Sequence, residues 1–181
     1  IVLERAKKIG CRVIIATSSD LSDNEIEIFA NKLNIEVYRG SMLNKIHRWY
    51  HCFSHFNLSN AMIIDADDPS FSFSLMRRAL IQLKEAKMDM IKGSSDLMPG
   101  FLTYGFNAVG IKKLFDVAQN SLLDTDVIST FIEKAKLTSA VVNPEKHEAK
   151  IDKIRLTVDY EEDVFFYNEL FKKISYLSES D

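Results

Sequence analysis

Short apolar runs alternate with segments of helical periodicity along almost the whole chain. Runs rich in β-branched residues are typical of buried strands, whereas apolar residues spaced three and four positions apart are typical of amphipathic helices. We therefore expect strands at residues 12–16, 35–38, 61–64, 88–91, 104–109, 139–142 and 154–158. We expect helices at residues 1–9, 22–33, 42–56, 72–83, 111–119 and 126–136, and from about residue 161 onward.

Strands that alternate with helices of this length predict βαβ crossovers and therefore an α/β fold. The expected architecture is a mostly parallel sheet with helices on both faces, in a single domain spanning residues 1–181. In such a sheet the ligand crevice lies beyond the carboxyl ends of the strands. The loops expected at that edge are 17–20, 39–41, 65–69 and 159–162.

The first ten residues form a helical stripe that ends at Gly10, but no capping residue precedes it and the chain does not begin with Met. A helix normally begins with a residue whose side chain accepts a bond from the first free amides. We therefore expect that the sequence begins inside a helix, and that an upstream strand and loop are missing from it.

The composition excludes some classes of protein. The 181 residues carry 23 Lys and Arg against 26 Asp and Glu, a formal net charge of -3, so we expect no nucleic-acid partner. A small basic cluster, Arg77, Arg78 and Lys84, is typical of a solvated helix face. The apolar runs are short and interrupted by charge, so no membrane span is expected.

Cys11 and Cys52 lack the spacing of a zinc or redox motif, so we interpret both as buried thiols. Buried free thiols are typical of a reducing compartment, and the chain has no signal-peptide pattern at its start. The expected location is the cytoplasm.

Two acidic segments follow predicted strands. Asp65, Asp67 and Asp68 come directly after the run 61–64, and carboxylate oxygens beside substrate phosphates are what a magnesium ion prefers. The alternative is a polar loop whose aspartates cap the next helix. In the second segment Glu161, Glu162 and Asp163 are explained by the helix dipole, whereas Asp159 precedes the helix and could share a metal with Asp67.

Four short segments together resemble a known family. Val13-Ile-Ile-Ala-Thr-Ser, Glu36-Val-Tyr-Arg-Gly-Ser, Ile63-Ile-Asp-Ala-Asp-Asp-Pro and Arg155-Leu-Thr-Val-Asp-Tyr-Glu-Glu-Asp match, in order, cytidylyltransferases of the spore-coat polysaccharide and CMP-sugar synthetase type, such as the CMP-Kdo and acylneuraminate enzymes. The resemblance implies a GT-A-like nucleotide-diphospho-sugar transferase fold that lacks its first strand and phosphate-binding loop. It also implies that Mg²⁺, CTP and a sugar or sugar acid are bound, and that CMP is transferred with release of pyrophosphate for surface polysaccharide biosynthesis.

The resemblance also implies roles for individual residues. Asp67 and Asp159 match the family's metal-binding, catalytic aspartates. The residues that match nucleotide-binding positions are Thr17, Ser18, Arg39, Ser41 and Arg48.

The sequence departs from the family pattern at several places. Asp68 stands where relatives often have cysteine or glutamate, and Tyr160-Glu161 replaces a threonine-proline pair. Thr125-Asp126-Val127, in a segment that would face the sugar, replaces glutamate-histidine-valine, and so an unusual acceptor is expected.

Two other functions remain open. A degenerate domain of this type could bind a nucleotide sugar, or dimerise, without catalysis. The Asp65-Ala66-Asp67 sequence also has the form of a haloacid-dehalogenase nucleophile motif, although Pro69 stands where that motif has threonine. The last helix is apolar over much of its circumference, which favours a homodimer contact or a deeply buried helix.

Overall fold

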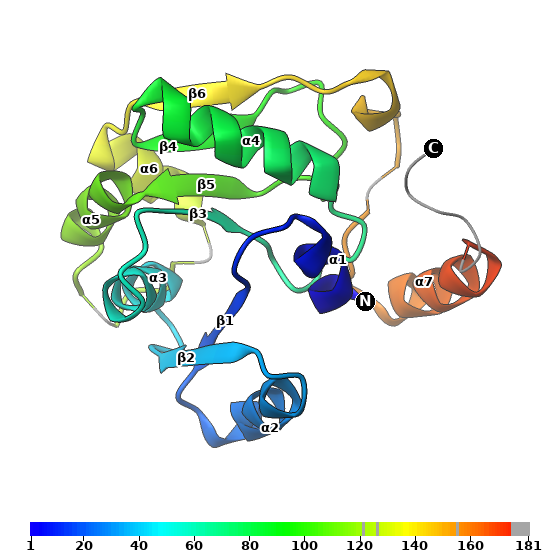
Figure 1. Ribbon diagram of the computed structural model, residues 1–181, viewed down its shortest axis with the longest axis horizontal. Coiled ribbons are helices and arrows are strands. Elements are labelled where there is room, and N and C mark those ends of the chain that lie inside the picture. The colour runs from blue at the N-terminus through cyan, green and yellow to red at the C-terminus, as the bar shows by residue number, and fades with distance from the viewer. Residues whose placement is uncertain (121, 126, 155, 175–181) are drawn as a thin grey trace.

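The computed structural model describes residues 1–120, 122–125, 127–154 and 156–174 (Figure 1). The strands are β1 (Ile14–Ser18), β2 (Glu36–Gly40), β3 (Asn60–Ile63), β4 (Met90–Gly93), β5 (Tyr104–Asn107) and β6 (Ser139–Val142). The helices are α1 (Val2–Lys8), α2 (Asn24–Lys32), α3 (Lys45–His55), α4 (Phe73–Ala86), α5 (Ala108–Val117), α6 (Ile128–Ala135) and α7 (Glu161–Ile174). The α/β fold and the alternation of strands and helices are as the sequence predicts.

The larger sheet has the strand order β3-β5-β4-β6. β4 and β6 are parallel, whereas β5 is antiparallel to both β3 and β4. β3, β4 and β6 therefore run the same way, and β5 is the reversed strand. The reversal has a local cause, because β4 is connected to β5 by the loop 94–103 rather than by the crossover helix that a parallel pair requires.

Helices cover both faces of this sheet (Figure 1). Successive strand residues point to opposite faces, so Met90 packs with α3, α5 and α6 while its neighbour Ile91 packs with α4. Phe106 and Trp49 belong to the first layer, and Leu75 belongs to the second. Complete burial of each such side chain contributes about 1.5–3 kcal/mol, so these two layers provide most of the stability of the domain.

The smaller sheet contains β1 and β2, which pair in parallel from Ile14↔Glu36 to Ser18↔Gly40. α3 packs against both of these strands as well as against α5, and so it connects the two sheets. The sequence predicts one sheet, but within the described residues β1 does not pair with β3.

Two local predictions are wrong. The described residues of the segment 154–158 form no strand, because the amide of Val158 donates to the carbonyl oxygen of Asp67 (2.8 Å) rather than to a neighbouring strand. Arg155 lies outside the described residues. Cys52 is buried as expected, but Cys11 is exposed.

The basic cluster on α4 is not simply a solvated face. Arg78 forms an ion pair with Glu148 (2.6 Å), whose side chain is fully buried, and Arg77 donates to the carbonyl oxygens of Lys8 and Ile9. Every described helix is too short or too polar to cross a bilayer.

Helix α7 is not deeply buried. Tyr167 is buried and donates its hydroxyl to the carbonyl oxygen of Leu156 (2.9 Å), but Phe165 and Phe166 are 70% and 50% exposed. The homodimer contact expected from this apolar helix stays a prediction.

Candidate functional site

Three aspartates gather in the loop that follows β3. One carboxylate oxygen each from Asp65, Asp67 and Asp68 lies within 4.8 Å of the others. The loop is tightened by the amide of Asp68, which donates to the carbonyl oxygen of Asp65 (3.2 Å). Oxygen atoms at this spacing suit a divalent cation such as Mg²⁺.

Asp68 is the most perturbed member of the cluster. Its side chain is nearly buried, and its Oδ1 has no hydrogen-bond partner among the described residues. Burial, together with the negative charges of Asp67, Asp65 and Asp159, raises the pKa of Asp68 to about 7. Burial also raises the pKa of Asp65, although the nearby Lys45 ammonium partly offsets this effect. Such crowding of carboxylates is stable only if protons or a cation reduce the repulsion.

Asp159 lies next to this loop although it is far away in sequence. The bond from the Val158 amide to Asp67 joins the two segments, and the charge of Asp159 contributes to the raised pKa of Asp68. The Thr157 hydroxyl donates to Asp159 Oδ2 (2.8 Å), and the amide of Asp159 donates to the carboxylate of Asp163 (2.9 Å). These bonds fix the chain just before α7.

The structure thus places Asp159 near the loop that carries Asp67, although Asp159 is not a member of the group of carboxylates within 4.8 Å of one another. The three-carboxylate group consists of Asp65, Asp67 and Asp68, the cluster that the sequence offers as a possible magnesium site, whereas the family resemblance names Asp67 and Asp159 alone. The unpartnered buried oxygen of Asp68 and the oxygen-only donor set fit Mg²⁺. The metal-binding role of each aspartate stays a prediction.

Thr17 and Ser18 lie at the carboxyl end of β1, where Asp23 fixes them. The Thr17 hydroxyl (2.7 Å) and the Ser18 amide (2.9 Å) both donate to Asp23 Oδ2. These bonds, from Ser18 and Thr17, lower the pKa of Asp23 to about 2. Asp23 therefore holds the β1 loop in place.

Arg39 and Arg48 also hold loops together. Arg39 donates to the carbonyl oxygens of Ser18 (2.9 Å) and Asp20 (2.5 Å), and it forms an ion pair with Glu27 (2.9 Å). Arg48 donates to the carbonyl oxygen of Ser41 (2.7 Å). Ser41 in turn accepts a bond from the Asn44 amide (3.1 Å) at the start of α3. The described contacts of both arginines are structural, and nucleotide binding by them stays a prediction.

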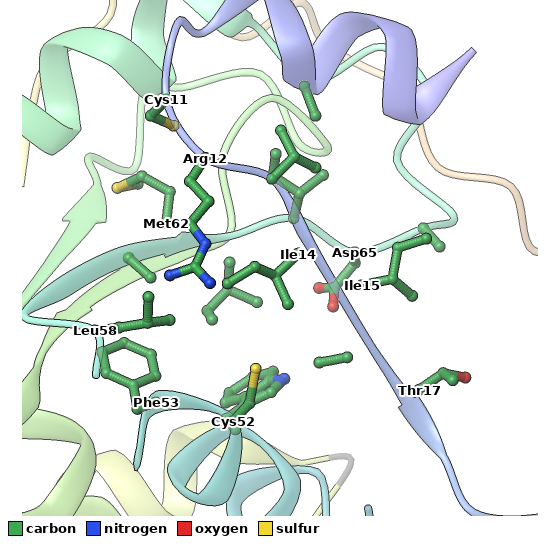
Figure 2. Close-up of a pocket in the computed structure, with 18 of the residues that line it drawn as sticks. Cys11, Arg12, Ile14, Ile15, Thr17, Cys52, Phe53, Leu58, Met62 and Asp65 are labelled. Carbon is green, nitrogen blue, oxygen red and sulfur yellow. The ribbon is translucent and has the colours of Figure 1, made fainter. Parts of the chain in front are cut away.

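A cavity of about 530 Å³ lies between β1 and β3 and has a polar end and an apolar body. Figure 2 shows Thr17 and Asp65 toward one side of it, and Cys11, Leu58 and Met62 toward the other. Of the predicted nucleotide-binding residues, Thr17, Ser18 and Arg48 line this cavity, whereas Arg39 and Ser41 do not.

A second cavity of about 440 Å³ opens on the other side of Asp65. Lys45, Trp49 and Asp65 line both cavities, and Tyr104 and Val127 line the second. Sequence reasoning missed Lys45 and Tyr104, because a lone lysine near a helix start and an aromatic in a strand carry no motif. Val127, from the segment that the resemblance places near the acceptor, lines this cavity, and Asp126 lies outside the described residues.

Comparison with protein-family models finds no match. The uncharacterised protein MJ1063 of Methanocaldococcus jannaschii is 26% identical over 174 residues, which cover 95% of this chain and 71% of that protein. A cytidylyltransferase from Leptospira borgpetersenii superposes with a TM-score of 0.80 at 21% identity, covering 98% of this chain and 75% of that one.

A protein from Desulfovibrio desulfuricans that is proposed to be a nucleotide-diphospho-sugar transferase gives a TM-score of 0.56 at 17% identity, over 97% of this chain and 72% of that one. At these sequence identities the likeness shows a shared fold and nothing further. The chain has the mixed α/β fold shared by these cytidylyltransferase and nucleotide-diphospho-sugar transferase structures.

Proposed function

We propose that this protein is a nucleotidyltransferase that transfers CMP from CTP to a sugar or sugar acid and releases pyrophosphate, for surface polysaccharide biosynthesis. The observation that carries the proposal is the group of three carboxylates at the end of β3, where a cavity opens on each side. The likeness to a cytidylyltransferase supports it.

Asp67 and Asp159, with Asp65 and Asp68 beside them, would hold Mg²⁺. The ion supplies positive charge to the triphosphate as negative charge moves to the leaving pyrophosphate. The protein itself orients the two substrates. Without a cation the four carboxylates would repel a triphosphate, so we expect nucleotide binding to require the metal.

The two cavities suggest which substrate lies where. We assign the nucleotide to the polar end of the larger cavity, near Thr17, Ser18 and Arg48. We assign the acceptor to the second cavity, between Trp49 and Tyr104. Lys45 and Asp65 line both cavities, so the reacting phosphate would lie where the two cavities meet. There the Lys45 ammonium can stabilise added negative charge.

The experiment is an assay of pyrophosphate release by the full gene product with Mg²⁺, each of the four common ribonucleoside triphosphates and a panel of sugar acids. Asp67→Asn and Asp159→Asn should each reduce the rate at least about a hundredfold, the typical cost of losing a transition-state charge contact. Glu162→Gln, an exposed carboxylate on the first turn of α7, is the matched control and should retain activity.

Full activity in both aspartate variants would refute the metal assignment. Binding of CTP without turnover of any acceptor would favour the non-catalytic alternative. Release of phosphate from an aryl phosphate, with no use of nucleotides, would favour the dehalogenase-like one.

We further propose that the functional unit is a homodimer that uses the exposed apolar face of α7. Phe165 and Phe166 of this helix are at least half exposed. Phe165→Glu should convert the dimer to a monomer in analytical ultracentrifugation, whereas Glu169→Gln on the same helix should not. A monomeric parent protein would refute this proposal.

A further inference from the structure

Three histidines recur at every fourth residue of α3, at positions 47, 51 and 55. Residues four apart are neighbours on the surface of a helix, so adjacent members of such a row can meet. His47 and His51 do meet, because their Nε2 atoms are 3.2 Å apart and their ring centroids are 4.3 Å apart. His55 makes different ring contacts, with Tyr38 and Phe56. The row therefore contains one converging pair and one separate histidine.

The spacing of the pair is that of two metal ligands. Imidazole nitrogens bind a tetrahedral Zn²⁺ ion at about 2.0–2.1 Å, which places two of them about 3.3–3.4 Å from each other. The Nε2 atoms of His47 and His51 are already close to this separation. Without an ion, one ring must donate a proton to the other, since two lone pairs that face each other repel. An ion between the rings accepts both lone pairs.

Aromatic rings hold the two imidazoles in place. Helix α5 packs against α3 (Figure 1), and the centroid of its Phe115 ring lies 5.4 Å from that of His47 and 5.5 Å from that of His51. Tyr50 stacks on Phe115 (4.1 Å) and makes an edge contact with His51 (5.1 Å). Side chains that are already held by packing lose less freedom when they bind a ligand. Both histidines are partly exposed, so an ion can reach them from solvent.

The surroundings also favour the neutral imidazole that a metal ion requires. His47 lies in the first turn of α3, where the helix dipole disfavours a positively charged ring. Burial, and to a smaller extent the neighbouring His51, lower the pKa of His47. Near neutral pH a metal ion therefore does not have to displace a proton from this side chain.

We propose that His47 and His51 form a binding site for a divalent transition-metal ion of the Zn²⁺ class, with their Nε2 atoms as ligands and water in the remaining positions. Imidazole nitrogen suits Zn²⁺, Cu²⁺ and Ni²⁺, whereas Mg²⁺ prefers oxygen. The histidine pair and the acidic loop after β3 thus select different ions. Neither histidine lines the two cavities, so the inference does not depend on the proposed reaction.

A bound ion would hold one turn of α3 closed, because both ligands belong to the same helix. The helix has 11 residues and packs against β1, β2 and α5. Helices of this length are marginal by themselves, and an ion that binds only the folded form stabilises it. Lys45 and Trp49, which line both cavities, belong to the same helix, so the ion would stabilise the element that supplies them.

The test is a calorimetric titration of the full gene product with Zn²⁺ in excess Mg²⁺, which competes for carboxylate oxygens but not for imidazole. Every protein carries Cys11→Ser, because the exposed Cys11 thiol would also bind Zn²⁺. His47→Gln and His51→Gln should each weaken Zn²⁺ binding at least about tenfold, the cost of losing even a group that only orients a ligand. His55→Gln, in the same row, is the matched control and should bind Zn²⁺ as the parent does.

NMR of the ring nitrogens of the parent protein gives a readout that does not depend on the folding of any variant. Addition of Zn²⁺ should shift the Nε2 signals of His47 and His51 together and leave those of His55 in place. Saturating Zn²⁺ should also raise the Tm of the parent and of His55→Gln, but not that of His47→Gln or His51→Gln.

Equal affinity for Zn²⁺ in all four proteins would overturn the proposal, as would a shift of one ring signal alone or of neither. Zn²⁺ binding that excess Mg²⁺ abolishes would place the ion in the acidic loop, and the proposal would then also be wrong.

Discussion

Neutralising Asp68 should stabilise the metal-free protein and remove most of the dependence of its stability on pH between pH 5 and pH 8. Asp68 is 8% exposed and has three other aspartates in its field, which together with burial raise its pKa from 3.8 to about 7. A carboxyl group with a raised pKa in the folded state binds its proton more tightly there than in the unfolded chain. The contribution of this group to the free energy of unfolding is therefore greatest below pH 4. It falls as the pH rises toward 7 and stays constant above pH 7.

The magnitude follows from the two pKa values. Each unit of difference corresponds to about 1.4 kcal/mol, so the whole shift corresponds to about 4 kcal/mol at high pH. Between pH 5 and pH 8 the wild-type protein should lose about 2–3 kcal/mol of unfolding free energy through this one group. In Asp68→Asn the side chain keeps its shape and loses the charge, so this part of the loss should disappear.

Urea denaturation at pH 5 and pH 8 in the presence of EDTA measures the effect as the difference between the two proteins. Asp152→Asn, which changes an exposed carboxyl, is the control and should follow the wild type. Added Mg²⁺ at pH 8 should stabilise the wild type, since a ligand that binds the folded state alone raises its stability, and should stabilise Asp68→Asn less. An equal loss of stability in wild type and Asp68→Asn between the two pH values would refute the reasoning.

Three further changes test contacts that stabilise the fold. Gly100→Ala should destabilise by about 1–3 kcal/mol in thermal denaturation, because Gly100 has φ +88° and an added Cβ would lie 2.8 Å from the carbonyl oxygen of Leu156; unchanged stability would contradict this. Glu148→Ala should cost about 3–5 kcal/mol, since it leaves Arg78 without its buried partner, whereas Glu145→Ala, on the half-exposed partner of the same arginine, should cost less than about 1 kcal/mol. Asp89→Asn should cost a similar amount at pH 5 and pH 8. Burial favours the neutral form of Asp89, but the Lys113 and Thr138 bonds outweigh this and lower its pKa, so its contribution is lost only in acid; a loss that changed with pH in this range would rule the assignment out.

The strands and helices could largely be predicted from the sequence because their signals are local. The apolar run at 12–16 corresponds to β1, and the helical segments 42–56 and 72–83 correspond to α3 and α4. The segment 154–158 failed because its apolar residues also suit an irregular chain whose partner is the loop at Asp67, and no local pattern distinguishes these two cases.

The part of the candidate site that directly follows a strand could be predicted from the sequence. The cluster after β3 was evident from its three aspartates. The proximity of Asp159 was expected from a strand at 154–158 that does not form, and the observed link is the bond from the Val158 amide to the carbonyl oxygen of Asp67.

The raised pKa values of Asp65 and Asp68 could not be predicted from the sequence, because they depend on burial and on charges distant in sequence, such as those of Lys45 and Asp159. The structural role of Arg39 could not be predicted either, because its hydrogen-bond acceptors lie about twenty residues earlier, at the end of β1 and in the loop that follows it.

The acidic loop is held from three sides, and these contacts keep its carboxylates close together. β3 fixes its start, and the Val158 amide holds Asp67 from the side of α7. At its end Ser72 caps α4 and also donates to buried Glu148 (3.0 Å), which the Arg78 guanidinium neutralises. The Arg78–Glu148 pair lies outside the acidic cluster, so it leaves the repulsion within the cluster intact while preventing the loop from relaxing. A loop constrained in this way holds its carboxylates in position before a ligand arrives, and a divalent cation is the ligand that such a preorganised group of carboxylates binds best.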